Sequence, residues 1–282
     1  MFKVLLQGGL GNQLFQVAAG IYLEKLSGQK VYFDESFLTK VPKKIRKREV
    51  EIRWLLDSEL ILKGNFRTLI TVTLRDLFAK KILDERNLND KVLDRLSSST
   101  EIIRGYFHNF EYVDVIWETL APKFKERFEE TDIESKYNYD YLCIHFRGGD
   151  CLYGKGKTRH GIIGPGYIQE ALETLKDKLK INKVIIVTDS PNFIKDRLDK
   201  VKGFDFSVIS SSNIFNDLAI ISRASGVVMS NSSFSWWGAF IADKFKNAMV
   251  IAPYPWFESD NEEPKLLIPE HWTQIKRDSF FN

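Results

Sequence analysis

The sequence predicts an α/β protein made of two similar halves, each built around a parallel sheet. Short continuous apolar runs, such as Val184–Val187 and Ala248–Ala252, alternate with stretches of helical periodicity, which is typical of strands buried on both faces. The 282 residues are enough for one large or two medium domains. With 44% hydrophobic and 28% charged residues, the composition excludes disordered, collagen-like and disulfide-scaffold chains.

The first half opens as strand, glycine-rich turn, helix and strand. We expect a strand at Lys3–Gln7, the turn Gly8–Gly11, a helix from about Asn12 and a strand at Lys30–Asp34. Apolar residues recur at steps of three and four within the helix, and Gly28 provides its end. This order predicts a βαβ unit.

Up to about residue 131, the sequence is rich in charged residues, and its apolar residues recur with helical periodicity. Its apolar positions predict a helix that includes Leu74, Leu77, Phe78, Ile82 and Leu83. One strand is expected within residues 101–106. Because the polar segment 129–138 precedes the next strand, at residues 141–146, we place the domain boundary there, between a domain at 1–135 and a domain at 136–282.

The second half repeats the α/β rhythm. A helix at about 167–179 leads to the strand at 184–187, and further strands are expected at 206–209, 226–229 and 248–252. The carboxyl ends of such strands are where open parallel sheets bind ligands. Four polar segments lie at these ends.

The first polar segment is Gly8–Gln13. Glycines at a strand-to-helix turn let backbone amides approach an anion, which makes Gly9, Gly11, Asn12 and Gln13 candidate ligand-binding residues. A tight turn without ligand is one alternative. A dinucleotide site with Asp34 on the ribose is another, although Leu14 replaces the small residue that this site requires.

The second segment is His145–Asp150. Strand alternation places His145 and Arg147 on one side, and a guanidinium there can clamp a diphosphate by paired hydrogen bonds. A plain salt bridge between Arg147 and Asp150, with His145 as a satisfied half-buried ring, is the structural alternative.

The remaining segments carry hydroxyl and carboxyl groups. Ser232 and Ser233 begin a helix and can grip a phosphate, whereas Trp236 and Trp237 are expected in the core. Asp189 and Asp217 can accept the paired N–H groups of guanine, although most aspartates at helix starts are caps.

Metal chemistry has no support in the sequence. No Asp-x-Asp pair is present, and the four histidines lack metal-ligand spacing. We therefore expect no metal and no cofactor, and the charge of a leaving diphosphate must be met by Arg147, backbone amides and helix ends.

Taken together, these segments resemble the bacterial α-1,2-fucosyltransferases of glycosyltransferase family 11. Gly8–Gln16 is similar to the N-terminal signature of that family, His145–Asp150 to its His-x-Arg-Arg-x-Asp motif, Asn231–Ala239 to its third signature and Ile268–Trp272 to its close. Gly148 departs from the pattern, because it stands where the family has a second arginine.

The resemblance implies a GT-B type fold, two Rossmann-like domains facing across a cleft, and metal-independent inverting transfer of fucose from GDP-fucose. The acceptor would be the 2-hydroxyl of a terminal galactose in a glycan or O-antigen unit. By the same likeness, Arg147 would bind the diphosphate, His145 and Asp217 would lie near guanosine, and Ser232 and Ser233 would meet phosphate. Asp150 and His160 are the candidate bases for the acceptor hydroxyl, and a phosphate oxygen of the donor is the alternative.

Two other functions stay open on the sequence alone. One is an NAD(P)-dependent oxidoreductase that uses Gly9, Gly11 and Asp34, and the other is a non-catalytic glycan-binding protein.

The location of the protein also follows from the sequence as an expectation. The net charge of +3 argues against nucleic acid as a partner, and no secretory signal is found, so Cys143 and Cys151 are interpreted as reduced thiols in the cytoplasm. The apolar runs are shorter than the roughly 20 residues that cross a bilayer. Peripheral contact of the basic run 43–48 with anionic lipid at the inner membrane face is an alternative to a solvated loop.

Overall fold

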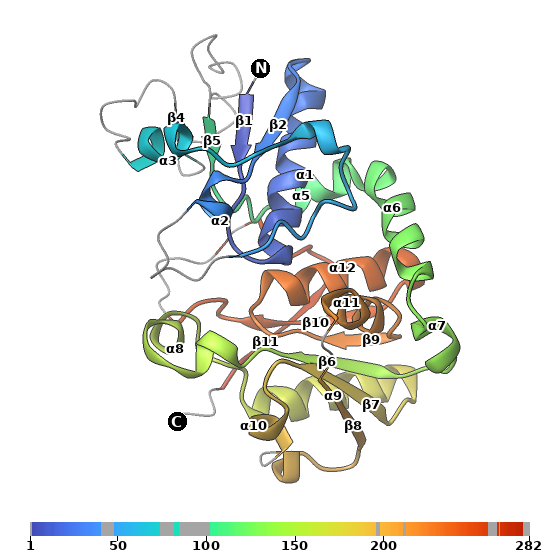
Figure 1. The fold of residues 1–282 in the computed structure, drawn as a ribbon. Helices are drawn as coiled ribbons and strands as arrows, with labels where there is room; N and C mark the ends of the chain where they lie inside the picture. Colours follow the sequence, from blue (N-terminus) through green and yellow to red (C-terminus); the bar gives the residue numbers. More distant parts are fainter. Residues whose placement is uncertain are drawn as a thin grey trace. The chain divides into compact units, whose positions relative to one another are not determined.

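The chain divides into two compact units, Met1–Lys125 and Glu126–Asn282. The division falls inside helix α6 (Trp117–Glu129), earlier than the polar segment that marks a boundary in the sequence. The computed structural model describes residues 2–40, 48–73, 82–84, 102–195, 198–210, 213–258, 264 and 266–278. Each unit contains one parallel sheet with helices packed on it (Figure 1), which confirms the predicted α/β fold class.

The first unit contains a five-stranded sheet in the order β3-β2-β1-β5-β4. Its central strand β1 pairs in parallel with β2 and β5, so the three strands predicted there are confirmed, each shorter than expected. The strands are β1 (Phe2–Leu5), β2 (Val31–Asp34), β3 (Ile61–Leu62), β4 (Ile82–Asp84) and β5 (Ile102–Arg104).

Helix α1 (Leu10–Ser27) connects β1 to β2 and begins two residues earlier than predicted. Gly8 makes the turn at a φ of +80°, where a Cβ would lie 2.4 Å from Nδ2 of Asn12. As predicted, the helix ends at Gly28, whose N–H donates to the Glu24 carbonyl. Among the described residues, the other helices that lie wholly in this unit are α2 (Ser36–Thr39), the 3-10 turn η1 (Ser58–Leu60), α3 (Phe66–Thr73) and α5 (Phe110–Val115).

The prediction of a helix through Ile82 and Leu83 is wrong. Both residues lie in strand β4, paired with Ile102 and Ile103 of β5. So short an apolar run fits either period, and pairing with the neighbouring strand decides between them. Leu74, Leu77 and Phe78 lie outside the described residues.

The second unit contains a six-stranded parallel sheet in the order β11-β10-β9-β6-β7-β8. Counted along the chain from β6, this is the 3-2-1-4-5-6 order of a Rossmann fold, which reverses between β6 and β9. The strands are β6 (Leu142–Phe146), β7 (Lys183–Thr188), β8 (Asp205–Ile209), β9 (Gly226–Val228), β10 (Met249–Tyr254) and β11 (Thr273–Lys276).

Helices cover both faces of this sheet: α9 and α10 lie on one face, α11 and α12 on the other (Figure 1). All five residues of β6 are buried. Complete burial explains why the sequence of this strand is almost continuously apolar, since each buried Leu or Ile side chain contributes roughly 1.5–3 kcal/mol to folding stability. The helical elements are α7 (Ile133–Lys136), η4 (Gly149–Leu152), α8 (Gly154–His160), α9 (Pro165–Leu179), α10 (Pro191–Lys195), η5 (Leu198–Lys200), α11 (Ile214–Ser222) and α12 (Ser233–Lys246).

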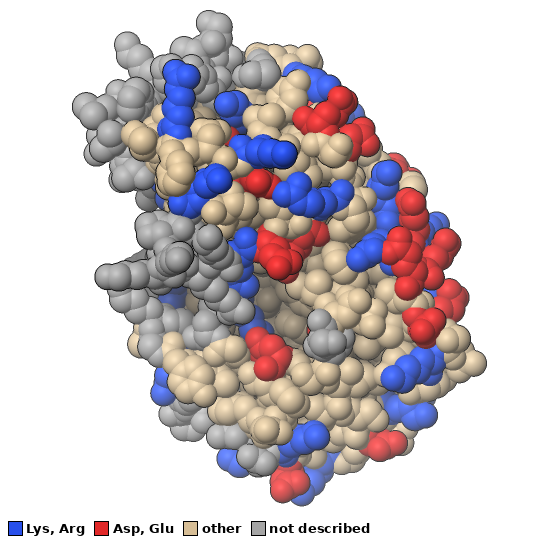
Figure 2. All heavy atoms as spheres, viewed as in Figure 1, with Lys and Arg blue, Asp and Glu red and all other residues tan. Residues whose placement is uncertain are grey.

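Lys and Arg are interspersed with Asp and Glu over the described part of the face drawn in Figure 2. The mixture agrees with the small net charge of +3. Cys143 and Cys151 are both buried and form no disulfide. Within the described residues, no helix has the length and apolar character needed to span a membrane.

Candidate functional site

Two of the predicted segments meet at the carboxyl ends of β6 and β9. These strands are neighbours in the sheet, paired from Leu142–Gly226 to Ile144–Val228. The end of β6 contacts the segment after β9, where Nδ1 of His145 lies 3.2 Å from Oγ of Ser230. Because the strand order reverses between β6 and β9, this is the crevice in which open α/β sheets bind their ligands.

His145 is a buried, neutral ring at this point. Burial, the larger cause, and the positive charge of Arg147 together lower its pKa to about 3. The ring packs against Phe234 of α12, with 5.2 Å between ring centroids. At neutral pH His145 therefore offers hydrogen bonds and a flat face, but no charge.

The turn after β6 is held by two residues that follow β7. The Gly148 N–H donates to Oδ1 of Asp189 at 2.8 Å, and the Gly149 N–H donates to Oγ of Ser190 at 3.1 Å. A Cβ on Gly148 would lie 2.3 Å from that Oγ, and Gly149 has a φ of +41°. Ser190 thus occupies the space that a side chain at position 148 would need.

Arg147 stands between His145 and this fixed turn. It is partly buried, and its charge acts on His145; it follows the last residue of β6, Phe146, and so lies just beyond the strand in which alternation was predicted. Asp189 is exposed, and holding the Gly148 amide is a role that the sequence did not predict for it. The side chain of Asp150, in η4, lies outside the described part of the chain.

The segment after β9 forms the N-terminus of α12, as predicted. Ser232 is its buried N-cap residue and makes no side-chain hydrogen bond to the first turn, and Ser233 is the first helical residue, partly buried. The amides and hydroxyls at the start of a 14-residue helix form a favourable environment for an anion. Trp236 and Trp237 are fully buried, which confirms their place in the core.

Two residues that sequence reasoning missed fix the position of this turn. Nδ2 of Asn231 donates to the carbonyls of His160 at 2.6 Å and Trp256 at 2.9 Å. The hydroxyl of Tyr167 donates to the carbonyls of Met229, at 2.9 Å, and Ile251, at 3.1 Å. Asn231 thereby ties the end of α8 to the site.

His160 is the last residue of α8, and Asp217 belongs to α11. The ring of His160 packs against Phe257, with centroids 5.3 Å apart. Asp217 lies in the first turn of α11, where Asn213, not Asp217, is the N-cap. Burial raises the pKa of the Cys143 thiol and the charge of Asp217 raises it further, so this carboxylate lies close to β6.

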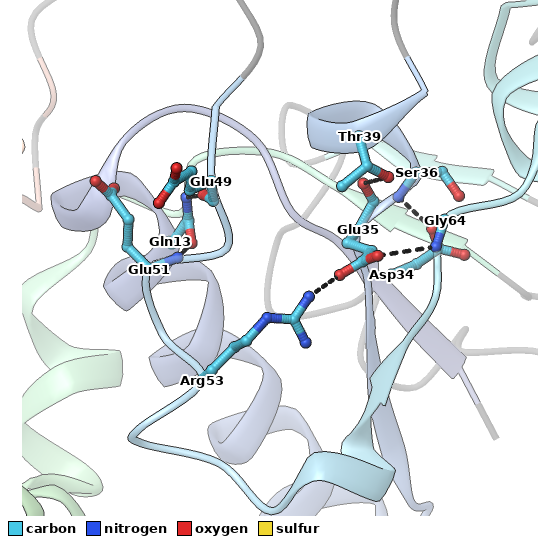
Figure 3. Close-up of polar contacts among 9 residues, drawn as sticks. All are labelled: Gln13, Asp34, Glu35, Ser36, Thr39, Glu49, Glu51, Arg53 and Gly64. Carbon is cyan, nitrogen blue, oxygen red and sulfur yellow. Dashed lines mark hydrogen bonds and ion pairs between the residues drawn. The ribbon is translucent and has the colours of Figure 1, made fainter.

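The first unit has a corresponding turn at the carboxyl end of β1. Gly9 is the N-cap of α1, and Gly11 and Asn12 lie in its first turn, with Oδ1 of Asn12 3.0 Å from Nε2 of His108. Gln13 is fully buried, and its Nε2 donates to the Gly8 carbonyl. The same Nε2 donates to the Glu49 carbonyl, and Oε1 of Gln13 accepts the Glu51 N–H (Figure 3). We therefore expect Gln13 to shape the turn rather than to touch a ligand.

Asp34 is committed to the fold of the first unit. Its Oδ1 accepts the Ser36 N–H at 2.8 Å (Figure 3). Its Oδ2 accepts the Thr68 hydroxyl at 3.0 Å, and the residue is only 1% exposed. An acid that binds a ribose must present its oxygens to solvent. The geometry therefore disfavours the NAD(P) alternative.

Comparison with known proteins decides the family. The sequence model of Glycosyl transferase family 11 matches residues 1–276. The chain belongs to glycosyl transferase family 11. It is therefore a glycosyltransferase, and the resemblance drawn from the sequence is confirmed.

Three relatives of this family 11 chain are informative. An alpha-1,2-colitosyltransferase of Escherichia coli is 25% identical over 290 residues, which covers 96% of this chain and 98% of the relative. The O-antigen biosynthesis glycosyltransferase WbnK of Escherichia coli is 21% identical over 302 residues, 96% of this chain and 99% of the relative. A galactoside alpha-(1,2)-fucosyltransferase 1 of Aotus azarae is 21% identical over 147 residues, 49% of this chain and 39% of the relative.

Within the described residues, no group of three or more His, Cys, Asp or Glu side chains is arranged to hold a metal ion.

Proposed function

We propose that this family 11 glycosyltransferase moves L-fucose from GDP-fucose to the 2-hydroxyl of a terminal galactose in a glycan or O-antigen unit, with inversion and without a metal. One observation carries the proposal: His145, Arg147 and the N-terminus of α12 lie together where the strand order reverses. The names of the relatives, two with an α-1,2 linkage and one in O-antigen biosynthesis, support the linkage and the acceptor class.

The proposed donor site assigns each group a task. Arg147 binds the diphosphate by paired hydrogen bonds, and the α12 amides with Ser232 and Ser233 bind its other side. His145, Asp189 and Asp217 face the nucleoside. All of these residues belong to the second unit.

Stabilising the leaving group is the main catalytic effect in this scheme. The bond from the sugar C1 to the diphosphate oxygen breaks with its electron pair going to GDP, and negative charge grows beside Arg147. A donor that is already oriented toward such charge contributes about 3–4 kcal/mol to lowering the barrier.

The test is a transfer assay with GDP-fucose and a galactose-terminated acceptor. We expect release of GDP, a product with an α-1,2 linkage by nuclear magnetic resonance, and full activity in EDTA. Strict dependence on a divalent metal, or a thermal shift with NAD(P) and none with GDP, would refute the proposal.

A second donor deserves a direct comparison because the colitosyl relative spans nearly the whole chain. Colitose is L-fucose without its 3-hydroxyl. A site that hydrogen-bonds this hydroxyl rejects the deoxy sugar by about 10⁴-fold or more, whereas an apolar site discriminates weakly. The ratio of kcat/KM for GDP-fucose and GDP-colitose therefore identifies the natural donor.

We also propose that the protein works in the cytoplasm, with peripheral contact to anionic lipid if its acceptor is lipid-linked. Most of the basic run 43–48 lies outside the described residues, so the support is its sequence. Each basic residue adds about 1 kcal/mol near an anionic surface. Sedimentation with anionic liposomes at low and high salt tests this.

A further inference from the structure

Tyr106 and His108 of the first unit form a stacked pair of rings to which the proposed donor site gives no task. Their ring centroids lie 5.6 Å apart, and the angle between the ring planes is 17°. Tyr106 is 44% exposed, whereas His108 is partly buried. We call these two residues the aromatic pair.

The aromatic pair lies where the strand order of the first unit reverses. Along the chain, β2 and β3 extend the sheet on one side of β1, whereas β4 and β5 lie on its other side (Figure 1). Tyr106 stands two residues after Arg104, the last residue of β5, and β5 is the neighbour of β1. The carboxyl ends of strands at such a reversal are where open α/β sheets bind ligands. The first unit therefore has a position of its own for a ligand.

Two buried glutamines fix the backbone that carries the aromatic pair. The Gly105 carbonyl accepts Nε2 of Gln7 at 3.1 Å and Nε2 of Gln16 at 2.9 Å. Oε1 of Gln16 in turn accepts the Gln7 N–H at 3.0 Å. Because buried polar groups lose free energy when they lose their partners, Gly105 is held in place directly before Tyr106.

The residue between the two rings is strained. Phe107 has a φ of +54°, in the left-handed region that a bulky side chain rarely adopts. Its own ring is only 1% exposed, so packing in the core holds it there. Strain of this kind persists where the surroundings impose it, and it gathers at functional sites. It is a second sign that the geometry of this segment serves a purpose.

His108 connects the aromatic pair to the start of α1. Its Nε2 donates to Oδ1 of Asn12 at 3.0 Å, since an amide oxygen can only accept, and its ring contacts Phe15 with 5.0 Å between centroids. Asn12 is partly exposed, and its Nδ2 donates no hydrogen bond to any residue that the structure describes. An amide donor therefore stands next to the exposed ring.

An exposed aromatic face beside a neutral amide suits an uncharged ligand with many hydroxyls. The face of an aromatic ring carries partial negative charge and attracts the partial positive charge of C–H groups. A pyranose presents C–H groups on its faces and hydroxyls around its rim. In galactose the axial 4-hydroxyl leaves the C–H groups of C3, C4 and C5 together on one face, whereas in glucose they are divided between both faces.

We propose that the aromatic pair binds a galactose ring of the acceptor glycan; its assignment to the acceptor rests on the proposed function. Tyr106 stacks on the C–H face of the sugar, and Nδ2 of Asn12 donates to one of its hydroxyls. Asn12, which the sequence predicted as a ligand-binding residue, then serves the acceptor. All the residues of this subsite belong to the first unit.

Direct binding tests this subsite without any transfer reaction. Saturation-transfer nuclear magnetic resonance on the full chain, with methyl β-galactoside as the probe, should show contact with wild type and a weaker signal for methyl β-glucoside. Tyr106→Ala should lose most of the galactoside signal, whereas Tyr106→Phe keeps the ring and should retain it. No galactoside signal with wild type, or the same signal with Tyr106→Ala, would overturn the proposal.

Acceptor kinetics give a second measurement. Tyr106→Ala should raise the KM for a galactose-terminated acceptor roughly 10-fold, the effect of losing one aromatic stacking contact. The KM for GDP-fucose and the melting temperature should stay unchanged, because Tyr106 is exposed and the glutamine bonds to Gly105 remain. The matched control is Tyr139→Ala, which removes a 39% exposed tyrosine before β6, at the opposite edge of the other sheet, and it should behave as wild type.

Titration of GDP by calorimetry separates failure of this subsite from failure of the proposed function. If Tyr106→Ala binds GDP and acceptor as wild type does, only the role of the aromatic pair is wrong. A loss of GDP affinity in Tyr106→Ala would assign the pair to a nucleobase and overturn the proposal. If wild type neither binds GDP nor transfers sugar, the proposed function fails, and the acceptor role of the aromatic pair fails with it.

Discussion

The turn after β1 and the turn after β9 use the same backbone device with different side chains. Each follows a central strand of a parallel sheet, and each opens a long helix whose N-cap makes no side-chain hydrogen bond. The first turn is lined by glycine and has Glu51 beside it, whereas the second is lined by serine hydroxyls and stands next to His145. The difference indicates that a helix N-terminus alone does not define a ligand and that the neighbouring side chains do.

Two aspartates sharpen this contrast. Asp34 ends the second strand of its sheet, and Asp189 directly follows the second strand of the other. Asp34 is buried with both oxygens bonded inside its own unit, whereas Asp189 is exposed and uses Oδ1 to hold the Gly148 amide. Asp34 and Asp189 therefore hold equivalent positions in the two sheets, but only Asp189 is accessible to a ligand.

Removing the positive charge of Arg147 should have the largest effect. Arg147→Ala should lower kcat by about 100-fold to 1,000-fold, the usual cost of losing one donor oriented toward developing charge. Lys178→Ala, an exposed change on α9, should leave kcat unchanged. Steady-state assays with GDP-fucose measure both, and equal rates for Arg147→Ala and wild type would remove the segment after β6 from the proposed donor site.

Restoring the arginine of the family motif should destabilise the protein. Gly148→Arg places a Cβ 2.3 Å from Oγ and 2.6 Å from Cβ of Ser190, and such overpacking costs about 1–3 kcal/mol. The double variant Gly148→Arg with Ser190→Gly should recover much of the loss in urea denaturation. If the single variant is as stable as wild type, Ser190 does not restrict this position.

Breaking the buried acid of the first unit should affect folding but not the nucleotide. Asp34→Ala leaves the Ser36 N–H and the Thr68 hydroxyl without their acceptor, which costs about 1–3 kcal/mol of unfolding free energy. GDP affinity by calorimetry should be unchanged. A loss of GDP affinity in a fully folded variant would revive a role for Asp34 in nucleotide binding.

The smallest effect concerns His145 and pH. Its pKa, about 3 in the folded protein, lies below the unfolded value of 6.5, so the unfolded state binds the extra proton. The stability linked to this ring is fully present above pH 6.5 and is lost progressively as the pH falls toward 3. Between pH 7 and pH 5, urea midpoints should therefore fall more for wild type than for His145→Gln, and equal slopes would contradict a buried neutral ring.

The sequence predicted the fold wherever burial on both faces leaves a continuous apolar run, as in β6 and β7. It did not predict β4, nor did it predict β11. The latter is an edge strand, and its sequence Thr-Gln-Ile-Lys is mostly polar. For the site, it predicted His145, Arg147 and Ser232 because strand ends and glycines are local signals.

Other site residues have no local signal. Ser190 and Asn231 acquire their roles from partners distant in sequence, such as Gly149 and Trp256. Sequence spacing carries no trace of such contacts.

The two tryptophans of the signature Asn231–Ala239 affect how active relatives should be recognised. Trp236 and Trp237 have no exposed surface, and Nε1 of Trp236 donates to the Leu267 carbonyl at 2.8 Å. These two positions of that signature therefore serve folding. A descendant that had lost all chemistry would still retain these rings, so an intact signature attests to a preserved scaffold, and only the residues around Arg147 report whether sugar transfer survives.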